Sequence, residues 1–166
     1  MFRMLFLLPL GAVLAALAGP AAATGRVEVV YDQPARFTDA GVGPIDLDRT
    51  QHVLNQHFAR LARRLPDGQV LRVQVRDVDL AGQVDLLSHD RVRIFGRPLD
   101  GPRLSLRYEL SDGAQLLRAG DDELADMSYR LRAGSASHTD ALPYERRLVE
   151  QWFVTRVAPV ARTGMR

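Results

Sequence analysis

The densest group of carboxylates in the sequence lies in the stretch GDDELADMSYR, residues 120–130. Carboxylates at this density can ligate a cation, or can work as a general acid and a general base. Asp121, Glu123 and Asp126 do not follow a calcium loop, which alternates its oxygen ligands around an internal glycine. In a strand, Asp121 and Glu123 share the face opposite to Leu124. The stretch therefore favours a charged strand end over a metal or acid–base site.

Asp77 and Asp79 are a second pair of carboxylates, on either side of Val78. On a strand, residues two apart face the same way, so this pair is also able to hold a cation or to act as acid and base. The other interpretation, which the pattern favours, places both acids on the solvent face beside a bulge. A hydrolase would have to draw its acidic cluster from Asp77, Asp79, Asp121, Glu123 and Asp126.

Four arginines alternate with apolar residues along two predicted strands, and we expect them on one wet face of a sheet. They are Arg72, Arg76, Arg103 and Arg107. Such a face is able to bind an anionic partner, for example a carboxylate-rich glycan or an envelope protein. The alternative is that the arginines only keep this face of the sheet soluble.

The sequence has no motif of a catalytic or cofactor-binding site: it lacks a phosphate loop, a dinucleotide glycine pattern, a nucleophile elbow and a zinc-binding H-E-x-x-H. Ser88-His89-Asp90 holds the residue types of a catalytic triad, but three adjacent residues cannot take those roles on one another. His52 and His57 are five apart, a poor spacing for two ligands on one helix face, and we interpret them as surface or boundary residues. We therefore assign no catalytic, cofactor-binding or metal-binding residue and expect no cofactor. Enzymatic activity stays open, with the pattern favouring none.

The first 23 residues have the pattern of a secretory signal peptide. Arg3 precedes an apolar run over residues 5–18, and Ala21 and Ala23 supply the small residues that a signal peptidase reads. This run of about 14 residues is too short to cross a bilayer as a helix. We expect cleavage after Ala23, release into the periplasm or the medium, and no membrane span afterwards. An uncleaved anchor is the alternative.

The composition describes a single globular domain, which we place at residues 24–158, followed by a disordered tail at 159–166. The chain has no cysteine, so packing alone must stabilise it in an oxidising compartment. All 22 basic residues are arginine, and with 20 acids the formal net charge is only +2. This balance is not the clustered basic excess of a nucleic-acid-binding protein.

Two amphipathic helices are predicted. Asp48 and Gln51 form a capping box at the start of the first helix, and an apolar stripe follows it. The stripe consists of Leu54, Phe58, Leu61 and Leu65. The second helix begins near Pro143, and Trp152 lies on its apolar face. We therefore expect Trp152 to pack this helix against the sheet as a structural residue.

The strand pattern predicts an antiparallel sheet of four to five strands. Apolar residues alternate over residues 26–31, 69–82, 91–95, 103–110 and 115–126. A change of parity predicts a bulge near Arg76-Asp77, and the sequence SDG at residues 111–113 predicts a hairpin turn. With two helices packed on one face of the sheet, these elements make a two-layer α+β sandwich.

The series DVDLAG, PRLSLRYEL, ELADMSY and PYERRLVEQWF resembles a bacterial family of exported proteins that is known only as a domain of unknown function. The similarity extends from about Val27 to Phe153 and depends on the order and spacing of the motifs rather than on a single one. It implies one exported domain with this order of strands and helices, and it implies no activity, cofactor or catalytic residue.

These observations predict an uncharacterised exported domain that serves as a binding or support module of the cell envelope. The alternative is a periplasmic hydrolase that uses the acidic cluster. An enzyme needs its acids to converge in a concave pocket, whereas a binding module does not.

Overall fold

The computed structural model describes residues 24–88, 92–97, 99–132 and 141–158. The predicted signal peptide, the predicted tail, and two residues of the Ser88-His89-Asp90 tripeptide lie outside this part of the chain. The elements follow in the order β1 (Arg26–Tyr31), η1 (Pro34–Arg36), α1 (Pro44–Ala62), β2 (Gln69–Asp79), β3 (Gln83–Val84), β4 (Arg93–Ile94), β5 (Arg103–Asp112), β6 (Gln115–Ala125), α2 (Tyr129–Arg132), α3 (Pro143–Trp152) and η2 (Phe153–Val157).

The main sheet has four strands in the order β1-β2-β5-β6, and the predicted α+β class is confirmed. The pairs β2–β5 and β5–β6 are antiparallel, as expected. The pair β1–β2 is parallel, so the prediction of a fully antiparallel sheet is wrong here. The reason is the connection: α1 returns across the sheet between these strands, so β2 starts from the same end of the sheet as β1.

The predicted strand at residues 91–95 does not join the main sheet. Its described part is β4, which pairs only with β3 in a separate two-stranded sheet. The alternation over residues 91–95 predicts one buried face, with Val92 and Ile94 inward, but both side chains are exposed. With only two residues in each strand, this small sheet has no face long enough to cover a core.

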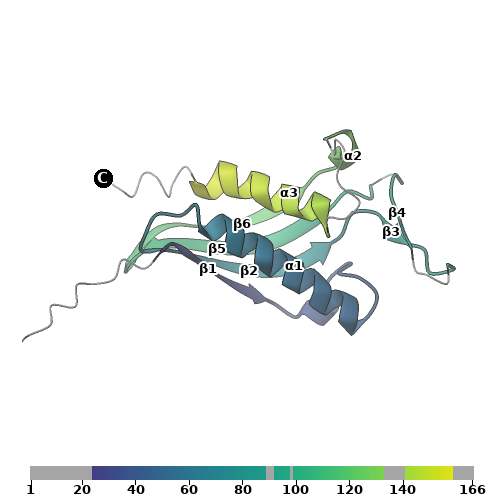
Figure 1. The fold of residues 1–166 in the computed structure, drawn as a ribbon, viewed down its shortest axis with the longest axis horizontal. Coiled ribbons are helices and arrows are strands. Elements are labelled where there is room, and N and C mark those ends of the chain that lie inside the picture. The colour runs from purple at the N-terminus through teal and green to yellow at the C-terminus, as the bar shows by residue number, and fades with distance from the viewer. Residues whose placement is uncertain (1–23, 89–91, 98, 133–140, 159–166) are drawn as a thin grey trace, which may run out of the picture.

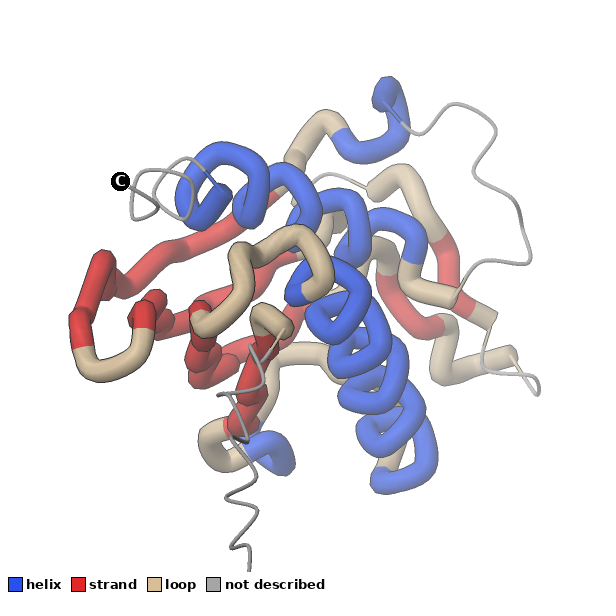
Figure 2. Tube along the Cα trace, turned by 60° about the vertical axis from the view of Figure 1, so that its left-hand side comes forward, coloured by secondary structure: helices blue, strands red, loops and turns tan. Residues whose placement is uncertain are grey.

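The two long helices, α1 and α3, lie on one face of the main sheet, as Figures 1 and 2 show. The predicted stripe of α1 is buried: Leu54 and Phe58 are fully enclosed, and Leu61 and Leu65 are nearly so. Within the described residues, no helix has the length and apolar character needed to cross a bilayer. The largest fully buried apolar side chains of the core are Phe58, Phe153, Leu54, Leu71, Leu104, Leu106, Leu110, Val73, Val75 and Val78.

The predicted bulge in β2 is confirmed. Val75 pairs with Leu106 and Asp77 pairs with Ser105, so that Arg76 is the extra residue between them. The insertion restores the parity of the strand, because Val75 and Val78 then both face the helices and are fully buried.

The β5–β6 hairpin turns two residues later than the sequence SDG suggested. β5 continues through Asp112, which pairs with Gln115, so the turn consists of Gly113 and Ala114. Gly113 has a φ of 54°, a backbone conformation that glycine adopts at little cost. Tyr108 and Leu110 are buried under the helices, as the alternation over residues 103–110 predicts for its apolar face.

The start of α1 differs from the prediction. The helix begins at Pro44 rather than at Asp48, so the capping box does not form its end. Pro44 takes the first helical position, where its missing N–H is not needed, and Gly43 precedes it with a φ of 87°. The last helix, α3, begins at Pro143 as predicted, and it continues into the π-helical turn η2.

Candidate functional site

The face of the main sheet that the helices leave open carries rows of alternating charges. Arg72 donates to Glu28 across the β1–β2 pair at 2.9 Å. Arg103 of β5 lies 3.9 Å from Asp79 of β2. Each of these arginines is therefore held by a carboxylate of an adjacent strand, the usual arrangement of opposite charges across a sheet.

Asp121 of β6 joins the other two arginines of this face. Arg107 donates two hydrogen bonds to its carboxylate, both of 3.1 Å, and Arg76 approaches it to 2.6 Å. The hydrogen bond with Arg107 lowers the pKa of Asp121 and raises the pKa of Arg107. The structure thus places all four arginines of the predicted anion surface in ion pairs: Arg72, Arg76, Arg103 and Arg107.

The two acids of β2 have different neighbours. Asp77 accepts hydrogen bonds from the backbone N–H and the hydroxyl of Thr38, both at 2.7 Å, and so fixes the loop that precedes α1. Burial raises the pKa of Asp79, and the Arg103 guanidinium opposes this rise. The first acid is thus a loop anchor and the second is the partner of a sheet arginine.

The acids of β6 are engaged as well. Glu123 accepts a hydrogen bond from the Ser105 hydroxyl at 2.5 Å. Asp126 accepts one from the Ser128 N–H at 2.9 Å, which closes the turn after the strand. Asp122 points the other way, toward the helices, and accepts a hydrogen bond from the Trp152 indole N–H at 2.8 Å.

The structure does not bring the five predicted acids together. Asp77 lies opposite Ser105, and Ser105 lies opposite Glu123, so a whole strand separates the two carboxylates. Neighbouring strands are about 4.8 Å apart, which puts the backbones of Asp77 and Glu123 about 10 Å apart. Among the described residues, no three His, Cys, Asp or Glu side chains are grouped to hold a metal ion. This arrangement supports ion pairing within a sheet face rather than acid–base chemistry.

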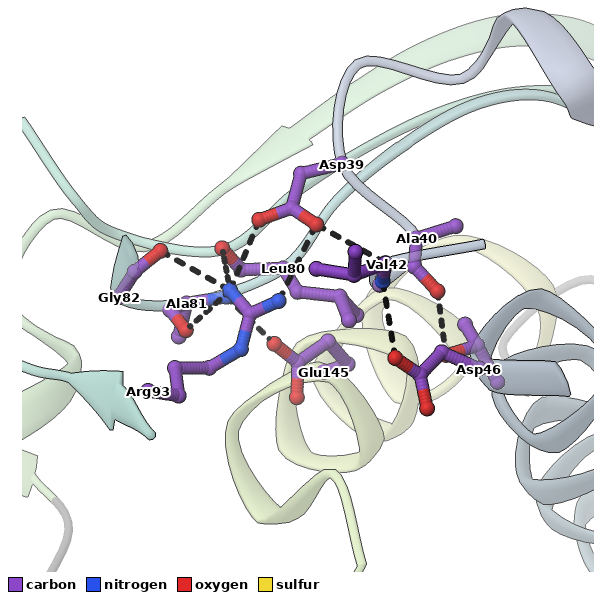
Figure 3. Close-up of polar contacts among 11 residues, drawn as sticks. Asp39, Ala40, Val42, Asp46, Leu80, Ala81, Gly82, Arg93 and Glu145 are labelled. Carbon is purple, nitrogen blue, oxygen red and sulfur yellow. Dashed lines mark hydrogen bonds and ion pairs between the residues drawn. The ribbon is translucent and has the colours of Figure 1, made fainter. Parts of the chain in front are cut away.

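An arginine outside the predicted sites attaches the small sheet to the main one. Arg93 of β4 donates to both carboxylate oxygens of Asp39, at 2.9 and 3.1 Å. The same guanidinium donates to three consecutive carbonyls that follow β2, those of Leu80, Ala81 and Gly82, at 3.5, 3.2 and 3.0 Å. Figure 3 shows this convergence, with Glu145 of α3 beside it.

Glu145 reaches the same place from the helix layer. Its side chain is buried, and its carboxylate accepts a hydrogen bond from the Ala81 N–H at 2.7 Å. Burial raises the pKa of Glu145, and the hydrogen bond from Ala81 opposes this rise. Because it is enclosed and bonded to the backbone, Glu145 works as a joint between α3 and the end of β2 (Figure 3).

Asp39 and Asp46 extend this network to α1. Asp39 also accepts a hydrogen bond from the Gly41 N–H, and Asp46 accepts one from the Val42 N–H, both at 2.9 Å. The sequence predictions missed this network because its members are single polar residues far apart in the chain; Arg93 and Asp39 are 54 positions apart. A periodic pattern does not reveal such contacts.

A second buried carboxylate ties α2 to the segment between β2 and β5, whose described residues 83–88, 92–97 and 99 we call the arm. Asp100 accepts hydrogen bonds from the N–H groups of Gly96 and Arg97, at 2.6 and 2.9 Å, and from the Tyr129 hydroxyl at 3.0 Å. Burial alone would raise the pKa of Asp100, but these donors together lower it. Burial and the bond to Asp100 raise the pKa of Tyr129 to about 12.

Aromatic rings pack at the same joint. The Phe95 and Tyr144 rings meet edge to face with centroids 5.5 Å apart, and the Tyr129 and Tyr144 rings do so at 4.7 Å. This geometry is favourable for aromatic pairs. The arm and α2 are therefore both fastened to α3 through Tyr144.

Beyond this joint, the arm and α2 carry most of the exposed large apolar side chains. Of the twelve such side chains among the described residues, seven lie on the arm and α2, and Met127 lies just before α2. We call these eight the apolar end: Leu86, Leu87, Val92, Ile94, Phe95, Leu99, Met127 and Leu131. Leu87 is 97% exposed and Leu131 is 90% exposed, so neither serves the core. Figure 1 shows β3, β4 and α2 at the same end of the molecule. A sequence signal for this surface existed in the leucine pair of DLLSHD, residues 85–90.

His57 is the one histidine that α1 turns into the protein. It was expected at the surface or its boundary, but it is buried. Burial lowers its pKa to about 4, and the nearby Arg146 and Arg60 act in the same direction. The His57 imidazole is therefore neutral near pH 7, and it serves as a buried packing residue of α1.

A protein-family model described as "Protein of unknown function (DUF3016)" matches residues 25–155 of the chain. No curated protein matches the chain, and no solved structure does. The comparisons thus give a family without an activity, and the geometry described above is the basis for a function.

Proposed function

The chain belongs to the DUF3016 family of proteins of unknown function, and from this premise we propose that it is a small exported binding module of the cell envelope. In this proposal the protein makes contact through its apolar end and does not act as an enzyme. In this reading the two helices lie on one face of the sheet, and one of them, α3, fastens the arm that carries the apolar end.

The observation that carries the proposal is the concentration of exposed apolar side chains at one end. Single exposed apolar residues are normal on a soluble protein, but a group of them marks a contact surface for a protein or a membrane. Here the exposed side chains belong to two separate segments, the arm and residues 127–131, which include the start of α2. Asp100 and Tyr144 hold both segments against the body, so the apolar surface is presented by an anchored structure.

The alternative of a hydrolase has less support. Each acid of the predicted cluster already has a partner in a turn, a loop or an ion pair, and the cluster spreads over two strands that β5 separates. An anionic glycan on the open sheet face is also less favoured. The four arginines of this face are already paired with carboxylates, so an anionic ligand would have to displace a carboxylate that the sheet holds in place.

Export is part of the proposal, supported by the apolar run and the alanines of residues 5–23. We expect the protein from its host to begin at or near Thr24 and to sediment with the envelope membranes. Replacing two leucines of the apolar end, Leu87→Glu with Leu131→Glu, should shift it to the soluble periplasmic fraction. Cell fractionation with mass spectrometry of the intact chain measures both results.

Leu116→Glu is the matched control for this experiment. Leu116 is also exposed, but it lies at the β5–β6 turn, at the opposite end of the sheet from the arm. We expect this variant to fractionate like the wild type. A chain that still begins at Met1 contradicts export, and a double variant that fractionates like the wild type contradicts the role of the apolar end.

A further inference from the structure

We propose that the apolar end binds the surface of an anionic lipid bilayer, with its leucines inserted among the acyl chains and its arginines at the headgroups. This inference depends on the proposed function and identifies the partner of the same surface. It commits to a lipid surface; a protein partner is an outcome of the test below.

The leucines are presented in the way that a lipid surface requires. Four of them stand almost free of the protein, with exposed fractions of 97% for Leu87, 90% for Leu131, 78% for Leu99 and 74% for Leu86. A bilayer accepts projecting apolar side chains without a complementary shape, and binding strength scales with the apolar area that is inserted. A protein partner instead needs a packed, complementary surface, usually with aromatic anchors.

Two arginines lie close in sequence to two of these leucines: Arg97 precedes Leu99 by two residues, and Arg130 directly precedes Leu131. Arg97 donates to the neutral side chain of Gln83, and among the described residues neither Arg97 nor Arg130 takes part in an ion pair. This contrasts with the sheet face, where all four predicted arginines are paired. Basic residues next to exposed apolar ones are the pattern of an interfacial lipid contact.

The two cations gather at one turn. The Arg130 guanidinium lies directly against Gly96, where a Cβ atom would be 2.0 Å from Arg130 Nη1, and Arg97 is the next residue of that turn. Gly96 has a φ of 102°, so both the close approach and the backbone there require glycine. The Arg130 guanidinium and Arg97 therefore lie at the same turn of the arm, and the Arg97 side chain reaches Gln83.

Among the described residues of this end, the carboxylates of Asp85 and Asp100 accept hydrogen bonds from the protein itself. Asp100 is buried beneath three donors, and Asp85 accepts a hydrogen bond from the Leu87 N–H at 3.0 Å. The bond from Leu87 closes the turn that exposes Leu86 and Leu87. Among the described residues, Arg97 and Arg130 thus remain available to meet a partner, and their charge complements anionic headgroups.

The test is co-sedimentation of the protein purified from its host with vesicles. One set contains phosphatidylglycerol and phosphatidylethanolamine, and the other contains phosphatidylcholine alone. We expect binding to the first set, weakened at least tenfold by Leu87→Glu with Leu131→Glu. Arg97→Gln with Arg130→Gln should bind the anionic vesicles several-fold more weakly and lose most of the salt dependence. The paired sheet arginines supply the control, Arg72→Gln with Arg107→Gln, which should bind like the wild type.

Two outcomes overturn the lipid inference. One is an absence of binding to anionic vesicles by a protein that still sediments with envelope membranes through its apolar end. That result would identify a protein partner and leave the proposed function standing. The other is vesicle binding that the sheet control weakens and the leucine variant does not, which would place the contact on the open sheet face.

Discussion

Trp152→Ala is expected to lower the free energy of unfolding by about 3 to 5 kcal/mol, the usual cost of removing a large aromatic side chain from a core. Trp152 is buried, and its ring packs edge to face with Phe58 of α1 and Tyr108 of β5, with ring centroids 6.4 and 5.3 Å apart. Its indole N–H donates to Asp122 of β6. The side chain thus joins both helices to the sheet, and the chain has no disulfide to compensate for its loss.

Denaturant unfolding of the wild type, Trp152→Ala and Trp152→Phe measures this effect. The phenylalanine variant keeps most of the ring contacts and loses the hydrogen bond, so it should fall between the other two even if the alanine variant fails to fold. Trp152 is the only tryptophan, so its fluorescence reports on this site alone. An easily quenched, red-shifted emission, together with an alanine variant as stable as the wild type, would reject the structural role.

Arg93→Met should cost about 2 to 4 kcal/mol, somewhat less than the loss of one partner from a fully buried ion pair. The pair keeps some contact with water, since the side chain of Arg93 is 20% exposed and that of Asp39 is 25% exposed. The substitution removes the two bonds to Asp39 and the donors of the carbonyls after β2. The arm then loses its attachment through Arg93 to the main sheet.

Two measurements follow this change. Denaturant unfolding gives the loss in the free energy of unfolding of the whole domain. Hydrogen exchange at the amides of β3 and β4 gives the loss in the free energy of local opening, which we expect to be the larger fraction of its wild-type value. Arg93→Lys is the matched control. It keeps the charge but loses the bidentate contact with Asp39, so its stability should lie between those of the methionine variant and the wild type. Unchanged exchange in β3 and β4 in the methionine variant would show that other contacts hold the arm.

The sequence was sufficient for the elements whose side chains alternate or repeat regularly. The stripe on α1 and the parity change in β2 are local patterns, and burial on one face enforces them, so the helix and the bulge follow directly. The parallel pairing of β1 with β2 does not follow from such a pattern. The alternation of a short strand is compatible with a parallel or an antiparallel neighbour. The direction of pairing is determined by the path of α1 across the sheet.

The candidate site was less predictable, for a similar reason. The acids and arginines of the sheet stand out in the sequence because they lie close together along the strands. In the structure they form ion pairs with one another. The Arg93 network joins four segments that are distant in the chain, so no window of sequence contains it. The apolar end was visible in part, but residues 91–95 were interpreted as a buried strand because their apolar residues alternate.

The central claim is that the apolar end, and not the open sheet face, is the surface that this protein uses in the cell. A photoreactive phenylalanine analogue placed at Leu87 or at Ala119 tests it most directly, because the first position lies on the apolar end and the second on an exposed part of β6. After irradiation of the host cells, mass spectrometry of the purified protein detects any lipid or protein adduct. We predict an adduct at position 87 and none at position 119. An adduct at position 119 without one at position 87 would contradict the account.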